Sequence, residues 1–107
     1  MKLLPSMVAA MTLATVFVTP AMASQELAQK KACMNCHGVD KAILGPSYKD
    51  VAAKYKGKKD AQAQLVQKVI NGGGGVWNMP MGPMPAQKGN VSDAEAKQLV
   101  AWILSQK

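Results

Sequence analysis

The stretch Cys33-Met34-Asn35-Cys36-His37 holds the two cysteines and the single histidine of the 107-residue chain. Two cysteines separated by two residues and followed directly by histidine form the attachment pattern for a c-type haem. On the last turn of a helix, thiols at this spacing lie close enough to bond the two vinyl groups of one porphyrin. The next residue then carries its imidazole under the iron. The pattern therefore predicts Cys33 and Cys36 as thioether attachments and His37 as the proximal ligand.

Two other kinds of site can use the same five residues. A redox dithiol of the thioredoxin type has the same cysteine spacing, but it belongs in a βαβ context. A structural zinc site normally takes four side-chain ligands, and the chain has no third cysteine and no second histidine. The zinc alternative is therefore weak, and the dithiol alternative depends on the fold.

The N-terminal segment has the three parts of a secretory signal peptide. Met1-Lys2 is a short basic start, and residues 3–18 are mostly apolar and uncharged. Ala21-Met22-Ala23 then gives the small-x-small pattern of a cleavage site. We therefore predict that residues 1–23 are removed and that residues 24–107 form one exported domain.

An uncleaved membrane anchor is the alternative for the same segment. The hydrocarbon core of a bilayer needs about 20 consecutive apolar residues. The apolar segment here is shorter, and it is interrupted by Pro5, Ser6, Thr12 and Thr15. The signal peptide is the better interpretation.

The predicted mature domain is short of bulky apolar material. It has 84 residues and only four aromatic side chains, Tyr48, Tyr55, Trp77 and Trp102. Domains of this size bury little surface and often need a cross-link or a cofactor. One haem c, tied by two thioethers and two axial bonds, would supply both bulk and cross-link.

The predicted mature domain is also strongly basic. It keeps twelve lysines, has no arginine and contains six acidic residues. A nucleic-acid partner is disfavoured, because the export signal and the lack of arginine for base contacts both argue against it. An excess of lysines often means only that the lysines lie on a solvated surface. A positively charged face can also attract an acidic protein and speed its encounter with this one. We therefore expect redox partner proteins with an acidic docking face.

Hydrophobic residues at helical spacing predict four helices. Ser24 is expected to cap the first helix, which should end by Gly38 and carry the cysteine motif on its last turn. The second helix is expected between Ser47, which starts a capping-box-like sequence, and Gly57. One apolar face of this second helix consists of Tyr48, Val51, Ala52 and Tyr55.

The other two predicted helices follow the same reasoning. The third is expected from Asp60, as N-cap, to Asn71-Gly72. The fourth starts at Ser92, which forms a full capping box with Glu95. The buried stripe of the fourth helix is predicted to consist of Ala96, Leu99, Val100 and Ile103, with Trp102 on its flank.

Residues 78–90 contain three methionines among prolines and glycine, and such a sequence cannot be helical. A hydrophobic surface loop is one explanation. With a haem ligand upstream, the segment instead predicts a distal strap whose thioether sulfur binds the sixth position of the iron. Prolines on both sides hold Met84 most rigidly, so Met84 is the predicted ligand, followed by Met81 and then Met79.

Two further positions have both a structural and a functional interpretation. Gly45-Pro46 marks a turn, and a carbonyl there could accept the Nδ1 proton of His37 and fix the ligating tautomer. Trp77 could cover the core, or its indole N–H could donate a hydrogen bond to a haem propionate. The residues alone leave both alternatives open.

The order of the motifs is specific. It comprises the Cys33–His37 motif, Gly45-Pro46, Gly75-Val76-Trp77, Pro83-Met84-Pro85 and the helix capped by Ser92. A chain with these motifs in this order resembles the class I cytochromes c, in particular the bacterial cytochrome c-551/c-552 (c8) group. Residues 45–52 and 91–96 look very like the matching runs of that group.

The resemblance implies an all-α fold, with about four helices packed around one covalently bound haem c. It maps the distal ligand onto Met84, the carbonyl that binds the proximal histidine onto Pro46, and the propionate-binding tryptophan onto Trp77. A polar residue that can bond near the ligand sulfur maps onto Gln87. The group usually has a shorter strap with one methionine, so the longer strap here is a departure.

The function implied by the resemblance is a soluble one-electron carrier in the periplasm of a Gram-negative bacterium. It would be a monomer and not an enzyme, and it would act between respiratory redox proteins. One alternative is a cytochrome subunit of a larger oxidoreductase. Another is a haem sensor or peroxidase-like protein with a labile distal methionine.

Overall fold

The computed structural model describes residue 3, residues 9–15 and residues 20–107. The predicted signal peptide, residues 1–23, therefore lies partly outside the described residues, and its cleavage stays a prediction. No helix in the described part of the chain is both long and apolar enough to span a bilayer.

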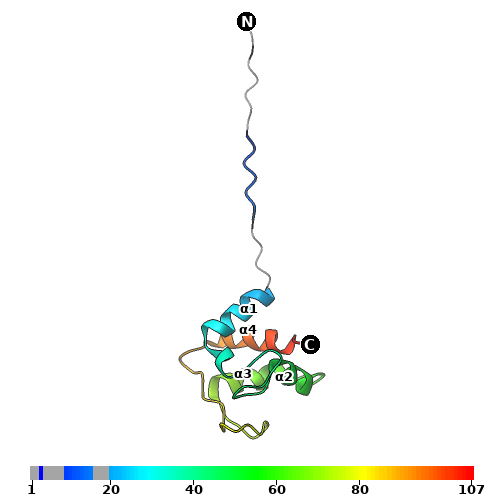
Figure 1. The fold of residues 1–107 in the computed structure, drawn as a ribbon, viewed down its shortest axis with the longest axis vertical. Coiled ribbons are helices and arrows are strands. Elements are labelled where there is room, and N and C mark those ends of the chain that lie inside the picture. Colours follow the sequence, from blue (N-terminus) through cyan, green and yellow to red (C-terminus); the bar gives the residue numbers. More distant parts are fainter. Residues whose placement is uncertain (1–2, 4–8, 16–19) are drawn as a thin grey trace.

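The described chain folds into four α-helices and one short 3-10 helix (Figure 1). No β-strand occurs within residues 20–107, where only isolated β-bridges are found. The predicted all-α fold is confirmed. The helices are α1 (Pro20–Lys30), η1 (Cys33–Asn35), α2 (Tyr48–Tyr55), α3 (Ala61–Asn71) and α4 (Asp93–Leu104).

Helix α4 is the centre of the fold. It lies between α1 on one side and α2 and α3 on the other, and it contacts all three (Figure 1). Ala96 and Val100 are fully buried and Leu99 is 1% exposed. Trp102, predicted on the flank of the stripe, is buried as well, whereas Ile103, predicted within the stripe, is only partly buried. Since α4 is covered from several sides, more of its circumference is buried than one stripe would require.

Side-chain caps fix the start of two helices, as predicted. The Ser47 hydroxyl accepts a hydrogen bond from Asp50 N at 3.1 Å and so caps α2. At α4, Glu95 N donates to Ser92 Oγ at 3.1 Å, and Ser92 N donates to Glu95 Oε1 at 3.0 Å. This is a complete capping box. Asp60 occupies the N-cap position of α3, but its side chain forms no capping hydrogen bond.

The prediction for the first helix was wrong at both ends. Helix α1 already begins at Pro20, so Ser24 lies inside it and is buried instead of capping it. The residues before Ser24 are alanine and methionine, which favour helix, so nothing in them stops the helix at residue 24. Helix α1 also ends at Lys30, before the cysteine motif.

The cysteine motif lies on a separate turn because Ala32 adopts a left-handed conformation, with φ 63° and ψ 17°. This residue closes α1, and its N–H donates to Gln29 O at 3.1 Å. The chain then enters η1, where the N–H groups of Cys36 and His37 both donate to Cys33 O. The 3-10 turn, rather than the last turn of α1, therefore positions the two thiols and the imidazole.

Candidate functional site

A cavity of about 350 Å³ lies between η1, α2, α3, α4 and residues 73–85. Its walls are mostly apolar side chains. Both cysteines, the histidine and all three strap methionines line it, although they come from opposite parts of the chain. The chemically distinctive lining residues are Cys33, Cys36, His37, Trp77, Met79, Met81 and Met84.

His37 is held in one tautomer. Its Nδ1 lies 2.8 Å from the carbonyl oxygen of Pro46. Because a carbonyl can only accept, Nδ1 carries the proton, and Nε2 keeps its lone pair for a metal. The hydrogen bond that the sequence suggested at Gly45-Pro46 is thus present.

An aromatic contact fixes the plane of the His37 ring. Tyr48 stacks on it, with 5.3 Å between the ring centroids and 20° between the planes. Tyr48 is buried and in turn meets Trp102 edge-on, with 5.3 Å between the centroids. The sequence pattern assigned Tyr48 only to the apolar face of α2, so its role beside the histidine was missed.

The two cysteines are half-buried free thiols. Burial raises the pKa of the Cys33 thiol above its ordinary value. A redox dithiol needs the opposite, a thiol with a lowered pKa that supplies the attacking thiolate. The fold also lacks a βαβ unit in residues 20–107. Both observations disfavour the dithiol alternative.

The methionine strap is anchored by its backbone at Met84. Gly73 N donates to Met84 O at 2.9 Å, and Met84 N donates to Gly73 O at 3.1 Å. Gly72 lies so close that a Cβ there would come within 2.5 Å of Met84 O. This pairing places residue 84 firmly against the end of α3.

The other two methionines lie on a turn of the strap that precedes Met84. Gly82 N donates to Met79 O at 3.2 Å and closes a tight turn over residues 79–82. Met81, on this turn, is 66% exposed, whereas Met79 and Met84 are half-buried. Gln87, the suggested polar neighbour of the ligand sulfur, instead donates from Nε2 to Pro85 O at 3.2 Å.

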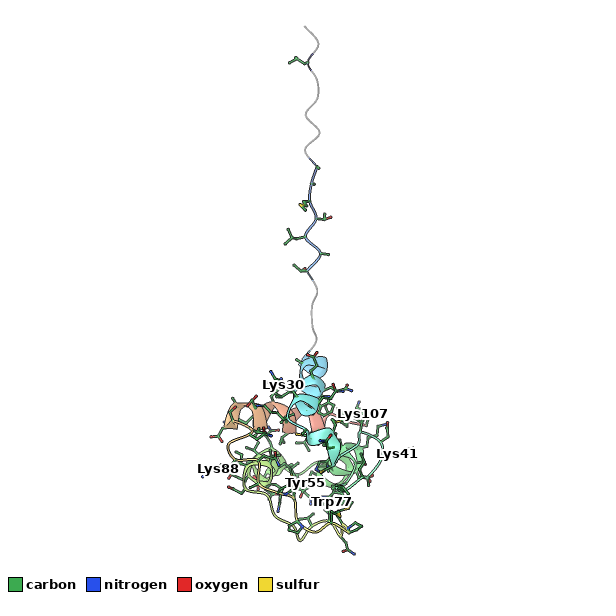
Figure 2. The ribbon with its side chains drawn as sticks, turned by 60° about the vertical axis from the view of Figure 1, so that its left-hand side comes forward. Lys30, Lys41, Tyr55, Trp77, Lys88 and Lys107 are labelled. Carbon is green, nitrogen blue, oxygen red and sulfur yellow. The ribbon has the colours of Figure 1, made fainter. Side chains whose placement is uncertain are left out.

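Trp77 lines the cavity on the side of the molecule farthest from α1, as does Tyr55 (Figure 2). The Nζ of Lys54 lies 5.2 Å from the centroid of the Trp77 ring. This contact joins residues 23 positions apart, and no spacing rule could have found it in the sequence.

The lining fits a covalently held haem. Two thiols, an imidazole with a free Nε2 and the methionines of the strap all line this one cavity. The remaining walls are apolar, as a porphyrin face requires, and Gly45 leaves room for the imidazole because a side chain there would collide with it.

A model of the family described as cytochrome c matches residues 21–107. The chain belongs to the cytochrome c family. This cytochrome is 53% identical over 83 residues to cytochrome c-552 of Hydrogenobacter thermophilus, covering 78% of this chain and 81% of that protein. It is 48% identical over 81 residues to cytochrome c-551 of Pseudomonas aeruginosa, covering 76% of this chain and 74% of that protein.

The fold agrees with the sequence comparison. The crystal structure of Nitrosomonas europaea cytochrome c552 matches with a TM-score of 0.71 and 47% identity, covering 78% of this chain and 99% of that chain. The cytochrome is therefore a class I protein of the c-551/c-552 group, with haem c attached through Cys33 and Cys36. It is a small electron-carrier protein and not an enzyme.

Proposed function

We propose that this cytochrome carries one electron at a time through an iron ligated by His37 Nε2 and Met84 Sδ. The observation that carries the proposal is that both residues line one cavity and that each is held by a backbone hydrogen bond, His37 to the Pro46 carbonyl and Met84 to Gly73. A haem c with these ligands cycles between Fe(II) and Fe(III) and keeps no open position for another molecule.

The protein holds the two proposed iron ligands in fixed positions and shields the site between them. The Pro46 carbonyl and the Tyr48 ring hold the imidazole in place, so its geometry can stay the same in both oxidation states. The backbone bridge between Gly73 and Met84 does the same for the proposed methionine ligand. A site that reorganises little on electron transfer suits a carrier better than a sensor or peroxidase, whose sixth position must open.

An optical spectrum of the oxidised and reduced holoprotein tests the ligand assignment. We expect a c-type spectrum with a weak far-red band from the methionine–iron bond. This band should be lost in Met84→Ala and kept in the matched variants Met81→Ala and Met79→Ala. If Met84→Ala keeps the band and one of the other two loses it, the assignment of Met84 is wrong.

The proposed place of action is the periplasm, between respiratory redox proteins. It is supported by the signal-peptide pattern of residues 1–23 and by the family membership. Mass spectrometry of the protein from a periplasmic fraction should give one haem on a chain that begins at Ser24. A haem-loaded chain that still starts at Met1 would contradict the cleavage site.

The proposed partners have an acidic docking face. Three lysines gather at the cavity: Lys68 lines it, Lys54 lies over Trp77, and Lys58 lies 5.1 Å from the centroid of the Tyr55 ring. Exposed Leu44, whose N–H donates to Cys36 O, offers an apolar surface beside the thioether edge, where the electron would leave.

Charge steering weakens as ionic strength rises, so it can be measured. We expect the electron-transfer rate with an acidic redox partner to fall steadily with added salt. Sedimentation at the same salt concentrations should show a monomer throughout. A rate that does not depend on salt would rule out steering by the lysines.

A further inference from the structure

The segment that carries Trp77 has little backbone support of its own. It follows four consecutive glycines, residues 72–75, and precedes the turn over residues 79–82. In the described chain, the backbone of residues 75–78 takes part in no backbone hydrogen bond. The isolated bridge between Gly73 and Met84 fixes the base of this loop but does not reach the tryptophan.

Trp77 nevertheless occupies a defined position in the cavity wall. Its side chain is half-buried, while its neighbour Val76 is 45% exposed, so the chain turns the indole inward at this point. The contact that reaches the ring from another element is the ammonium of Lys54, 5.2 Å from the ring centroid. This distance lies within the range of a cation–π interaction with tryptophan, the aromatic side chain that binds cations best.

Lys54 is presented by a rigid element. It lies in the last turn of α2, a helix that is capped at its start by Ser47 and packed into the core through Val51 and Ala52. A loop with few backbone hydrogen bonds can therefore be held at a fixed place by a side chain on a well-packed helix. The four-carbon stem of lysine also covers apolar surface beside the ring.

We propose that Lys54 is a positioning residue that holds Trp77, and with it the glycine loop, against the haem pocket. By closing this wall it limits the access of water to the iron site. Solvent access and local polarity tune the reduction potential of a haem, so the effect of Lys54 reaches the iron through Trp77 rather than by direct contact. The proposal rests on the haem pocket and does not depend on which methionine binds the iron.

The direct test follows the indole N–H of Trp77 by NMR in the reduced holoprotein. Its hydrogen-exchange rate should rise about two- to fivefold in Lys54→Met, the change expected when one exposed cation–π contact is lost. Lys54→Arg keeps a cation over the ring and should restore the slow exchange. Lys59→Met removes the same charge from an exposed position nearby and should leave the rate unchanged. Trp102 provides an internal reference, because it is buried in the core.

The reduction potential provides a second, independent measurement. Lys54→Met should lower it by more than Lys59→Met does, because opening the wall admits water that favours Fe(III). In a Trp77→Leu background this excess should disappear, since Lys54 then has no ring to hold. A c-type spectrum of every variant shows that the haem is loaded, which separates failure of this proposal from failure of the fold.

Three results would overturn the proposal. The first is an unchanged indole exchange rate in Lys54→Met. The second is an equal rise in Lys59→Met, which would indicate a general effect of charge. The third is a potential shift for Lys54→Met that persists in full in the Trp77→Leu background, which would mean that Lys54 acts on the iron without the tryptophan.

Discussion

The backbone of Gly45 lies directly against the imidazole of His37, so that a Cβ at residue 45 would come within 2.8 Å of Nδ1 and 3.0 Å of Nε2. The ring cannot move away, because Tyr48 stacks on it and the Pro46 carbonyl holds Nδ1. Glycine at residue 45 is therefore part of the iron site, although it offers no side chain to it.

We predict that Gly45→Ala destabilises the holoprotein by about 1–3 kcal/mol, the usual effect of overpacking a tight site. It should also disturb the His37–Pro46 hydrogen bond. Urea unfolding measures the first effect, and the shift of the His37 ring protons in NMR measures the second.

Gly74→Ala is a matched control for this substitution. The nearest atoms to a Cβ there are 3.5 Å away, in ordinary contact, and the backbone does not need glycine. We expect a change within about 0.5 kcal/mol. Equal destabilisation by the two substitutions would show that contact with the imidazole is not the cause.

Gly72 is restricted both by its backbone conformation and by its contact with the strap. We therefore predict that Gly72→Ala is more damaging than Gly45→Ala. The φ of 69° and ψ of −161° at Gly72 belong to a region that is nearly exclusive to glycine. A Cβ there would also meet backbone atoms, 2.5 Å from Met84 O and 2.7 Å from Ala86 N. We expect a loss of about 2–5 kcal/mol and a weaker far-red methionine band.

Gly57→Ala separates the two contributions to this loss. Gly57 also has a positive φ, 78°, but a Cβ there would have no atom within 4 Å. Gly57→Ala should lower the free energy of unfolding only by the backbone strain, about 1–2 kcal/mol, and should leave the far-red band intact. If the two glycine variants behave alike in both measurements, the contact between residue 72 and the strap has no effect on the ligand.

The features that the sequence predicted well depend on short-range chemistry. A hydroxyl at Ser47 or Ser92 needs only the N–H three residues ahead to cap a helix. The cysteine motif and the Gly45-Pro46 turn are likewise local. These features follow from a few adjacent residues, whatever the rest of the chain does.

The features that were missed depend on contacts between distant segments. The contact of Lys54 with Trp77 and the pairing of Gly73 with Met84 exist only after the helices have packed. The burial of Trp102 also depends on how several helices cover α4. Periodicity within one helix cannot show how many sides of it will be covered.

The left-handed conformation of Ala32 is another feature that the sequence did not reveal, and it leads to a prediction. In this region an L-residue other than glycine lowers the free energy of unfolding by about 1–2 kcal/mol, because its Cβ is crowded. Glycine has no such strain, but the greater entropy of its unfolded chain lowers the free energy of unfolding by about 0.4–1 kcal/mol. We therefore expect Ala32→Gly to stabilise the holoprotein by roughly 0.5–1 kcal/mol in urea unfolding.

The same substitution at an ordinary helical position is its control. Ala53 is exposed on α2, and Ala53→Gly should destabilise by about 0.5–1 kcal/mol. Opposite signs at the two positions would verify the conformation of residue 32. Destabilisation at both would mean that Ala32 is not left-handed in solution.

The capping box of α4 predicts how stability depends on pH. The pKa of Glu95 lies below its ordinary value, mainly because its carboxylate accepts a hydrogen bond from the Ser92 N–H, with further help from the Ser92 hydroxyl and from Lys31. A carboxyl with a lower pKa in the folded state stabilises that state fully above its unfolded pKa of about 4.3. The stabilisation is lost as the pH falls through the folded pKa.

Glu95→Gln should therefore lower the melting temperature at pH 7, and the difference from wild type should shrink as the pH falls below 4. The amide can still accept from Ser92 N–H, so the lost part is the charge-assisted part of the cap and the ion pair with Lys31. Glu26→Gln, at an exposed position of α1, removes the same charge away from the cap and reports the effect of net charge alone. A deficit in Glu95→Gln that is unchanged from pH 7 to pH 3, or one matched by Glu26→Gln, would show that ionisation of the capping box contributes nothing to the stability of the fold.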